Sequence, residues 1–441
     1  MNHPRRFLVF LLALMLLGLS CGTAAAEEKP AEEKQGLIDK LMTILAGKNL
    51  PRVDIPAPPP LSPGAAGQKP PGMKKAASVE VAHNFLPVYA LDRDSEPAPQ
   101  VLPFFSSAPV NEAHAGIAQL VIMIHDSDRE AARAFAFIRS AGDEASARHP
   151  EWAARDAFLF APQFLNGPDI AARASEWPDG GQALLRWSEE SWAYGAESAP
   201  AQMEGEGWAP RRGMSSFAVM DYVLLILARP QMLPDLKRVV IAGTGAGADF
   251  VQRYAALGVS PDVLSEEGID IRFAVANAHS YVYLDRNRAS ANTMTPAKPG
   301  SEAPAFTEIS NQICAVVNNW PFGLEELPLY GKKQGAPDIR LRYSARKVFY
   351  IAGDGATLPL FDTTPQACAY SMQGATTKAR AVNFFASLDR LYGHELDASQ
   401  RFTLIPKVNE DGLDLWRSPC GGSLLFSDGG ECKPPQQEPG E

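Results

Sequence analysis

The hydrophobic pattern is clearest between residues 237 and 256. Residues 239–242 form a short apolar run, as in a strand covered on both faces, and apolar side chains then recur at helical spacing from Phe250 to Ala255. Glycines stand at alternate positions between the two, at 243, 245 and 247. Because closely spaced glycines let two backbones approach, the pattern predicts a buried strand that enters a helix through a crowded turn.

Segments of the same two kinds follow each other along the chain. Residues 79–91 and 101–105 are predicted to open the domain as an antiparallel pair, and helical periodicity falls at residues 129–138 and 220–228. Strands that alternate with helices at these lengths predict an α/β fold with a mostly parallel sheet and helices on both faces. Buried strands are expected at residues 120–124, 157–161, 238–242, 272–276, 347–352 and 402–405.

One connection is far longer than the usual ~4–6 residues. It joins the strand ending at residue 276 to the strand starting at residue 347. Because ligands of open α/β sheets bind beyond the carboxyl ends of the strands, we expect a lid over that edge, at about residues 285–335. The domain is expected to span residues 78–426. A turn stapled by Cys420 and Cys432 is expected at its end, and a disordered tail is expected at residues 427–441.

The first 26 residues have the composition of a secretory signal. Two arginines precede an apolar block that is too short to span a membrane, and a cleavage site of small residues ends at Ala26. A lipoprotein signal ending at Cys21 is the alternative, although the residues ahead of this cysteine fit it less well. Residues 27–77 predict a Pro-rich linker with a short amphipathic helix at residues 37–45. The chain is therefore expected in the periplasm or the medium, with no transmembrane segment after signal removal.

The charge and the cysteine content argue against a nucleic-acid partner and against a metal site. The formal net charge is −10, which argues against nucleic acid as a partner. Four cysteines remain after signal removal, and an even number in an exported chain favours two disulfides over a metal site. We expect no cofactor and no metal. The expected pairs are Cys314 with Cys368, between lid and body, and Cys420 with Cys432 in the final turn.

The order of the motifs resembles the α/β-hydrolases, in particular a secreted branch with a long lid. The marks are His125 after the third strand, Ala-Pro-Gln-Phe-Leu at residues 161–165, Ser-Ser-Phe at residues 215–217, the glycine corner, and Val-Ala-Asn at residues 275–277. The resemblance implies hydrolysis of an ester or peptide by a serine, an acid and a histidine, with an oxyanion hole after the third strand.

Each catalytic role implied by the resemblance falls on a residue that does not fit it. The nucleophile position is Gly245. The acid position is Ala356, with Asp354 as the nearest carboxylate, and the base position is Glu410. Without the hydroxyl and the imidazole, only substrate binding and the oxyanion hole remain. The sequence therefore predicts a protein that does not hydrolyse by this route and that binds a small ligand or a protein partner.

Three other interpretations stay open on the residues alone. Gly243, Gly245 and Ala248 match the dinucleotide fingerprint G-x-G-x-x-A, although Asp249 would repel a pyrophosphate at the start of the helix. A tight corner with no chemistry left is the second interpretation. The third is hydrolysis by a relocated set such as His279 with Asp354 or Glu410, or metal binding if His125, His279, Asp354 and Glu410 converge. The hydroxyl of Thr244 is expected to point away from the nucleophile position. The candidates for the pocket are His125, Asp126, Thr244, Gly245, His279, Asp354 and Glu410.

Overall fold

The computed structural model describes residues 82, 84–88, 100–152, 154–176, 181, 183–200, 213–289, 305–356, 366–396, 399–410 and 412–432. The expected signal, with Cys21, and the linker lie outside the described residues. Within the part of the chain that is described, no helix is both long enough and apolar enough to cross a membrane.

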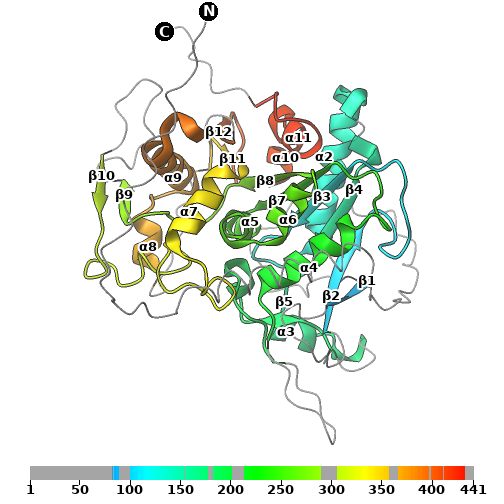
Figure 1. The fold of residues 1–441 in the computed structure, drawn as a ribbon, viewed down its shortest axis with the longest axis horizontal. Coiled ribbons are helices and arrows are strands. Elements are labelled where there is room, and N and C mark those ends of the chain that lie inside the picture. The colour runs from blue at the N-terminus through cyan, green and yellow to red at the C-terminus, as the bar shows by residue number, and fades with distance from the viewer. Residues whose placement is uncertain are drawn as a thin grey trace, which may run out of the picture.

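A sheet of eight strands forms the middle of the molecule, in the order β1-β2-β4-β3-β7-β8-β11-β12 (Figure 1). β1 pairs antiparallel with β2, and β2 pairs antiparallel with β4, whereas every pair from β4 to β12 is parallel. The strands are β1 (Asn84–Val88), β2 (Gln100–Ser106), β3 (Gln119–Ile124), β4 (Phe158–Pro162), β7 (Arg238–Thr244), β8 (Asp270–Ala276), β11 (Lys347–Gly353) and β12 (Gln400–Ile405).

Alternate residues of each central strand enter two separate cores, because successive side chains of a strand point to opposite faces. In β7, Val239 and Ile241 lie in the larger core, and Val240 and Ala242 lie in the smaller one. The expected fold class, a mostly parallel sheet with helices on both faces, is confirmed. The larger core is covered by α4 (Ser216–Ala228), α5 (Ala246–Leu257) and α9 (Thr377–Tyr392), and the smaller one by α2 (Ala131–Arg148), α10 (Gly412–Arg417) and α11 (Pro419–Phe426).

Two helices are longer than their hydrophobic patterns predicted. Helix α2 continues to Arg148 because its second half buries small residues, such as Ala141 and Ala145, that give no strong apolar signal. Helix α4 starts earlier than expected. The Ser215 side chain accepts a hydrogen bond from the Phe217 N–H and so caps its first turn.

The segment around Cys420 differs from the expected turn. It is a buried helix, α11, and the Ser418 side chain caps it by accepting a hydrogen bond from the Gly421 N–H. Glycine at this position interrupts the helical pattern in the sequence. A side chain there would meet the Leu415 carbonyl oxygen at 2.1 Å, so the close approach of α10 and α11 requires glycine.

Both disulfides expected from the sequence are present. Cys314–Cys368 joins the long connection to α8 (Ala367–Ser371), and Cys420–Cys432 closes the turn after α11. Residues 427–432 thus belong to the described chain. Residues 433–441 of the expected tail lie outside it.

Buried arginines fasten the connection between β8 and β11 to the body. In this connection, β9 (Asn287–Ala289) and β10 (Phe306–Glu308) form a two-stranded pair. The chain then runs from β10 to helix α7 (Ala336–Ala345). We call residues 309–335 the insert. Arg288 is fully buried, and its Nη2 donates to the carbonyl oxygens of Val317 at 2.6 Å and Phe322 at 3.1 Å.

The buried Arg288 contacts predict a specific stability cost. We expect Arg288→Met to lower the free energy of unfolding by about 2–4 kcal/mol, because two buried carbonyl oxygens lose a charged donor. Urea unfolding measures this change. The matched control is Arg286→Met, whose side chain is 56% exposed and pairs with Glu325. That change is expected to cost less than about 1 kcal/mol. Equal losses in the two variants would contradict the assignment.

Candidate functional site

The corner between β7 and α5 has the backbone of a nucleophile elbow but no side chain. Gly245 stands between the strand and the helix with φ 60° and ψ −122°. A residue with a side chain is strained in this conformation, and the elbow of hydrolases accepts such strain to present its nucleophile. Here the position presents only an α-carbon.

The carboxylate of Asp126 fills the space in which a nucleophile would stand. A Cβ built on Gly245 would meet its Oδ1 at 2.3 Å and its Cγ and Oδ2 at 2.5 Å. Asp126 Oδ1 accepts hydrogen bonds from the Ala246 N–H at 2.8 Å and from the Ser127 N–H at 2.7 Å. The residue after the nucleophile and the loop after the third strand are the two sources of oxyanion-hole donors in the α/β-hydrolase arrangement. An internal carboxylate therefore occupies both the nucleophile position and these donors.

His125 is a buried structural residue that sets the place of Asp126. Its Nε2 accepts the Phe164 N–H at 2.9 Å, so the proton lies on Nδ1, which donates to the Asp126 carbonyl oxygen at 2.8 Å. Burial lowers the pKa of His125 to about 4, and the imidazole is neutral at physiological pH. Trp192 packs against the ring, with 4.5 Å between ring centroids. Because both ring nitrogens are engaged in hydrogen bonds, neither is free to bind a metal or to take a proton from a substrate.

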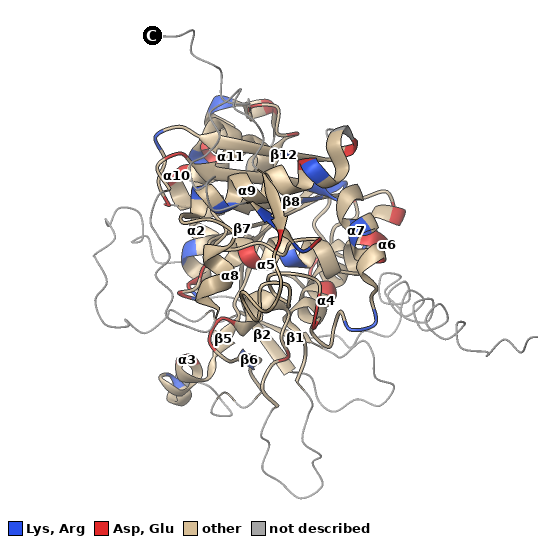
Figure 2. Ribbon diagram, turned by 90° about the vertical axis from the view of Figure 1, so that its left-hand side faces the viewer, with Lys and Arg blue, Asp and Glu red and all other residues tan. Residues whose placement is uncertain are grey.

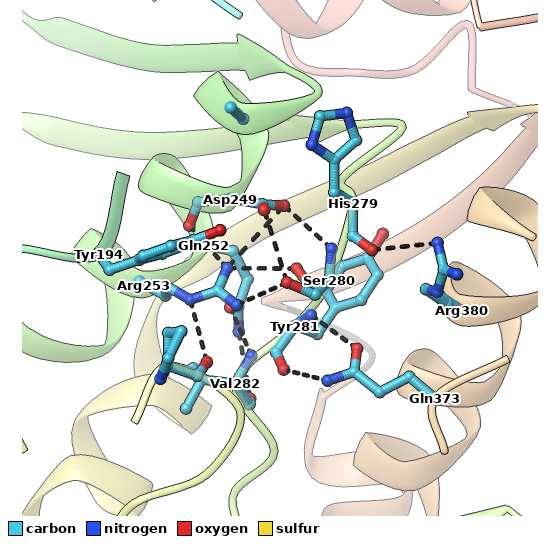
Figure 3. Close-up of polar contacts among 12 residues, drawn as sticks. Tyr194, Asp249, Gln252, Arg253, His279, Ser280, Tyr281, Val282, Gln373 and Arg380 are labelled. Atoms are coloured by element: carbon cyan, nitrogen blue, oxygen red, sulfur yellow. Dashed lines mark hydrogen bonds and ion pairs between the residues drawn. The ribbon is translucent and has the colours of Figure 1, made fainter. Parts of the chain in front are cut away.

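His279 is the imidazole that the structure brings close to the corner. It follows β8, and its Nε2 lies 4.0 Å from Asp126 Oδ1, beyond hydrogen-bond distance. Its backbone is held on both sides, as Figure 3 shows. Arg380 donates to the His279 carbonyl oxygen at 3.3 Å, and the next residue, Ser280, donates its N–H to Asp249 at 3.1 Å. The side chains of Asp126 and His279 remain 38% and 23% exposed.

A buried ion pair forms the layer beneath these residues. Asp249 and Arg253 lie one turn apart on α5 and are fully buried, with 3.9 Å between Arg253 Nη1 and Asp249 Oδ1 (Figure 3). Burial raises the pKa of Asp249, and the charge of Arg253 partly offsets this. Arg253 also donates to carbonyl oxygens of Ser280 and Pro321. This pair explains why an acidic residue stands in the first turn of α5.

The dinucleotide interpretation does not fit this corner. A pyrophosphate needs free N–H groups at the start of the helix. The Ala246 N–H is already bound to Asp126, and a second carboxylate, Asp249, lies in the same turn of α5. The local charge at the helix start is therefore negative.

Glu190 is a site residue that the sequence did not reveal. It precedes the short 3-10 helix η4 (Ser191–Tyr194), in a stretch without hydrophobic periodicity. Burial raises the pKa of Glu190, and the nearby charge of His279 opposes the shift. Glu190 lies at this edge because it precedes η4, whose Trp192 packs on His125. The contact between Trp192 and His125 can be recognised only once the fold is known.

The expected acid and base loops are packed against each other. Ala356 is fully buried, and the Asp354 carboxylate accepts the Lys407 N–H at 2.8 Å instead of facing an imidazole. A Cβ at Gly353 would meet the Val408 carbonyl oxygen at 2.2 Å, so the turn after β11 lies directly on the loop after β12.

The loop that carries Glu410 is fixed from the neighbouring strand. Asn277, which follows β8, donates to the Asn409 carbonyl oxygen and accepts the Gly353 N–H, each at 3.0 Å. Glu410 itself is half-buried. Asp354 and Glu410 thus follow β11 and β12, while Asp126, Gly245 and His279 follow β3, β7 and β8.

Thr244 and the cysteines lie away from this group. The Thr244 hydroxyl accepts the Trp416 indole N–H at 2.8 Å and so points towards α10. Both cysteine pairs are oxidised. Among the residues that the structure describes, no three His, Cys, Asp or Glu side chains are placed to hold a metal ion.

The arrangement limits what the site can do chemically. The α-carbon of Gly245 offers no atom to carry an acyl group, and an ester carbonyl oxygen cannot reach the Ala246 N–H while Asp126 holds it. What remains is the Asp126 carboxylate and the His279 imidazole, both partly exposed, above the buried and hydrogen-bonded Asp249–Arg253 pair. Figure 2 marks the Lys and Arg positions and the Asp and Glu positions along the ribbon, and both kinds occur on the described elements.

The chain is only distantly similar to known proteins. No family model matches the sequence, and no curated protein is significantly similar to it. Among solved structures, it is similar to LpqC, a poly(3-hydroxybutyrate) depolymerase from Bordetella parapertussis, with 17% identity, a TM-score of 0.44, and coverage of 74% of this chain and 84% of that one. Poly(aspartic acid) hydrolase-1 from Sphingomonas sp. KT-1 gives 16% identity, a TM-score of 0.43, and coverage of 74% and 94%. Values this low carry no argument about activity. By its own sheet order and strand-to-helix corner, the chain has an α/β-hydrolase-like fold.

Proposed function

We propose that this protein is exported, has no serine-hydrolase activity, and binds a small ligand at the carboxyl ends of β3, β7 and β8. The observation that carries the proposal is the Asp126 carboxylate, whose Oδ1 accepts the Ala246 N–H beside the bare α-carbon of Gly245. A transition state for acyl transfer needs a nucleophile and free donors at this place. Both requirements are lost together.

Binding is supported by the difference in exposure between the residues at the surface of the site and those beneath them. Asp126 and His279 are partly exposed, whereas Asp249 and Arg253 beneath them are fully buried and hydrogen-bonded. A rigid base that holds exposed polar groups is suited to recognition, since little conformational entropy is lost when a ligand binds. Because a carboxylate has replaced the hydroxyl, the ligand is proposed to offer hydrogen-bond donors to it. Export is supported by the two disulfides.

A second candidate function is acid–base chemistry by a non-standard set. The distance of 4.0 Å between His279 Nε2 and Asp126 Oδ1 favours it. A small shift on ligand binding would bring the two groups into hydrogen-bond contact, and an imidazole oriented by a carboxylate is a general base. In this candidate function, Asp126 orients the imidazole in place of the Asp354 or Glu410 expected from the sequence.

The two candidates differ in their behaviour towards esters. We expect the wild-type protein to show no turnover of short-chain p-nitrophenyl esters and no labelling by a fluorophosphonate, because no hydroxyl stands at position 245. Gly245→Ser is also expected to stay unlabelled, since its side chain collides with the Asp126 carboxylate. Intact-protein mass spectrometry measures the labelling.

The control variant removes the Asp126 carboxylate, which frees both the space at position 245 and the Ala246 N–H. Asp126→Gly/Gly245→Ser is expected to label at least about tenfold faster than the single serine variant, because the Ala246 N–H is released. Wild-type ester turnover that disappears in His279→Ala would refute the proposed function and favour the second candidate.

The structural role proposed for His125 predicts a pH dependence of stability. Its pKa is about 4 in the folded protein, below the ordinary histidine pKa of 6.5 expected in the unfolded chain, so the unfolded chain binds the proton first as pH falls. The contribution is fully present above pH 6.5 and is lost progressively down to about pH 4, a loss of about 3 kcal/mol. In urea unfolding at several pH values, His125→Gln is expected to lack this part of the decline. An identical decline in both proteins would be incompatible with a buried neutral His125.

A further inference from the structure

Helix η4 lies between the candidate site and the insert. On one side, Glu190 precedes it and Trp192 within it packs against His125, at 4.5 Å between ring centroids. On the other side, the Tyr194 carbonyl oxygen accepts the Trp320 indole N–H at 2.7 Å. The Tyr194 hydroxyl also lies 3.2 Å from the Tyr370 hydroxyl on α8. Any movement of the insert relative to α8 therefore acts on η4.

The Cys314–Cys368 disulfide holds the insert and α8 together. Its surroundings form a small apolar cluster of their own, separate from the two cores of the sheet, in which Phe322 packs on Tyr370 at 5.0 Å between ring centroids. Cys314 is buried and Cys368 is half-buried. Buried hydrogen bonds from Arg288 fasten the insert to the body, whereas the disulfide and the packing of Phe322 on Tyr370 are contacts that tie the insert to α8.

The second disulfide has a different setting. Cys420 belongs to the smaller core under the sheet, together with Leu424 and Phe426 of its own helix. Its loop spans 12 residues, and it does not join two separate elements of the fold in the way that Cys314–Cys368 does. It therefore serves as an internal control.

We propose that the Cys314–Cys368 disulfide is a redox-sensitive control on the candidate site, acting through η4. A dithiol reductant gives two electrons and two protons to the bond, so that two cysteine thiols and one oxidised dithiol are formed. The insert, which Arg288 still holds to the body, can then shift relative to α8, and the two contacts of Tyr194 are no longer held in register. Release of η4 loosens Glu190 and the packing of Trp192 on His125, which positions Asp126.

The inference rests on the proposed function in one respect, namely that this edge is the functional site. The coupling itself is tested without a ligand, by hydrogen exchange with mass spectrometry on Cys314→Ser/Cys368→Ser. The reporter amides are those of Gly195 and Ala196, which donate to carbonyl oxygens of η4. A third reporter is the Arg129 amide, which donates to the Asp126 carbonyl oxygen. We expect these amides to exchange at least roughly tenfold faster than in wild type, with β3 and β7 unchanged.

Two comparisons keep the test decisive. Cys420→Ser/Cys432→Ser is expected to speed exchange only around α11. Wild-type protein treated with dithiothreitol until mass spectrometry shows Cys314–Cys368 reduced is expected to reproduce the first result, which covers the case that the serine variant folds poorly. Faster exchange confined to residues 309–322 and 366–372 would overturn the proposal, and so would an equal effect of the control variant on η4. Neither outcome depends on ester turnover, so the coupling and the proposed function fail separately.

Discussion

The structure of the site depends on a steric exclusion between one side chain and one α-carbon. The Asp126 carboxylate and a side chain at position 245 cannot occupy the same space, since a Cβ there would lie 2.3–2.5 Å from the carboxyl atoms. With glycine at 245, the carboxylate reaches the start of α5 and accepts two N–H groups. The negative charge also lies at the favourable end of the helix dipole. The corner is thus satisfied without a substrate.

The loops after β8, β11 and β12 also use their polar groups for contacts within the protein. Asp354 and Asn277 use their polar groups to hold the loop after β12, and Ala356 is buried in the turn that is expected to expose the acid. Backbone contact between these loops removes the room in which an acid and a base would face each other. The turn after β11 and the loop after β12 are therefore packed against each other, whereas Asp126 after β3 and His279 after β8 stay partly exposed.

Much of the fold was predictable because its strands are buried on both faces. Continuous apolar runs such as Val239–Ala242 identify such strands, and their order along the chain predicts a parallel sheet. Helix α11 was not predictable, because Gly421 serves a close contact with α10 that sequence periodicity does not record. Helix α2 was predicted too short, since small residues pack as well as large ones where a helix lies close to its neighbours.

For the site, the sequence identified the bare nucleophile position but not what fills it. The α/β-hydrolase pattern expects glycine after His125 and a side chain at 245, and this chain has Asp126 and Gly245 instead. That exchange was the available signal, although its meaning depends on two loops that only the fold brings together. Glu190 could not be found, because nothing near it in the sequence marks its approach to His279.

The most direct measurement of the central claim is a double-mutant cycle between Asp126→Gly and Gly245→Ala, read as free energies of unfolding in urea. If the carboxylate occupies the space at position 245, the methyl group will cost less when Asp126 is absent, with a coupling of about 0.5–3 kcal/mol. Additive effects would contradict the account, because they would mean that the two residues do not meet.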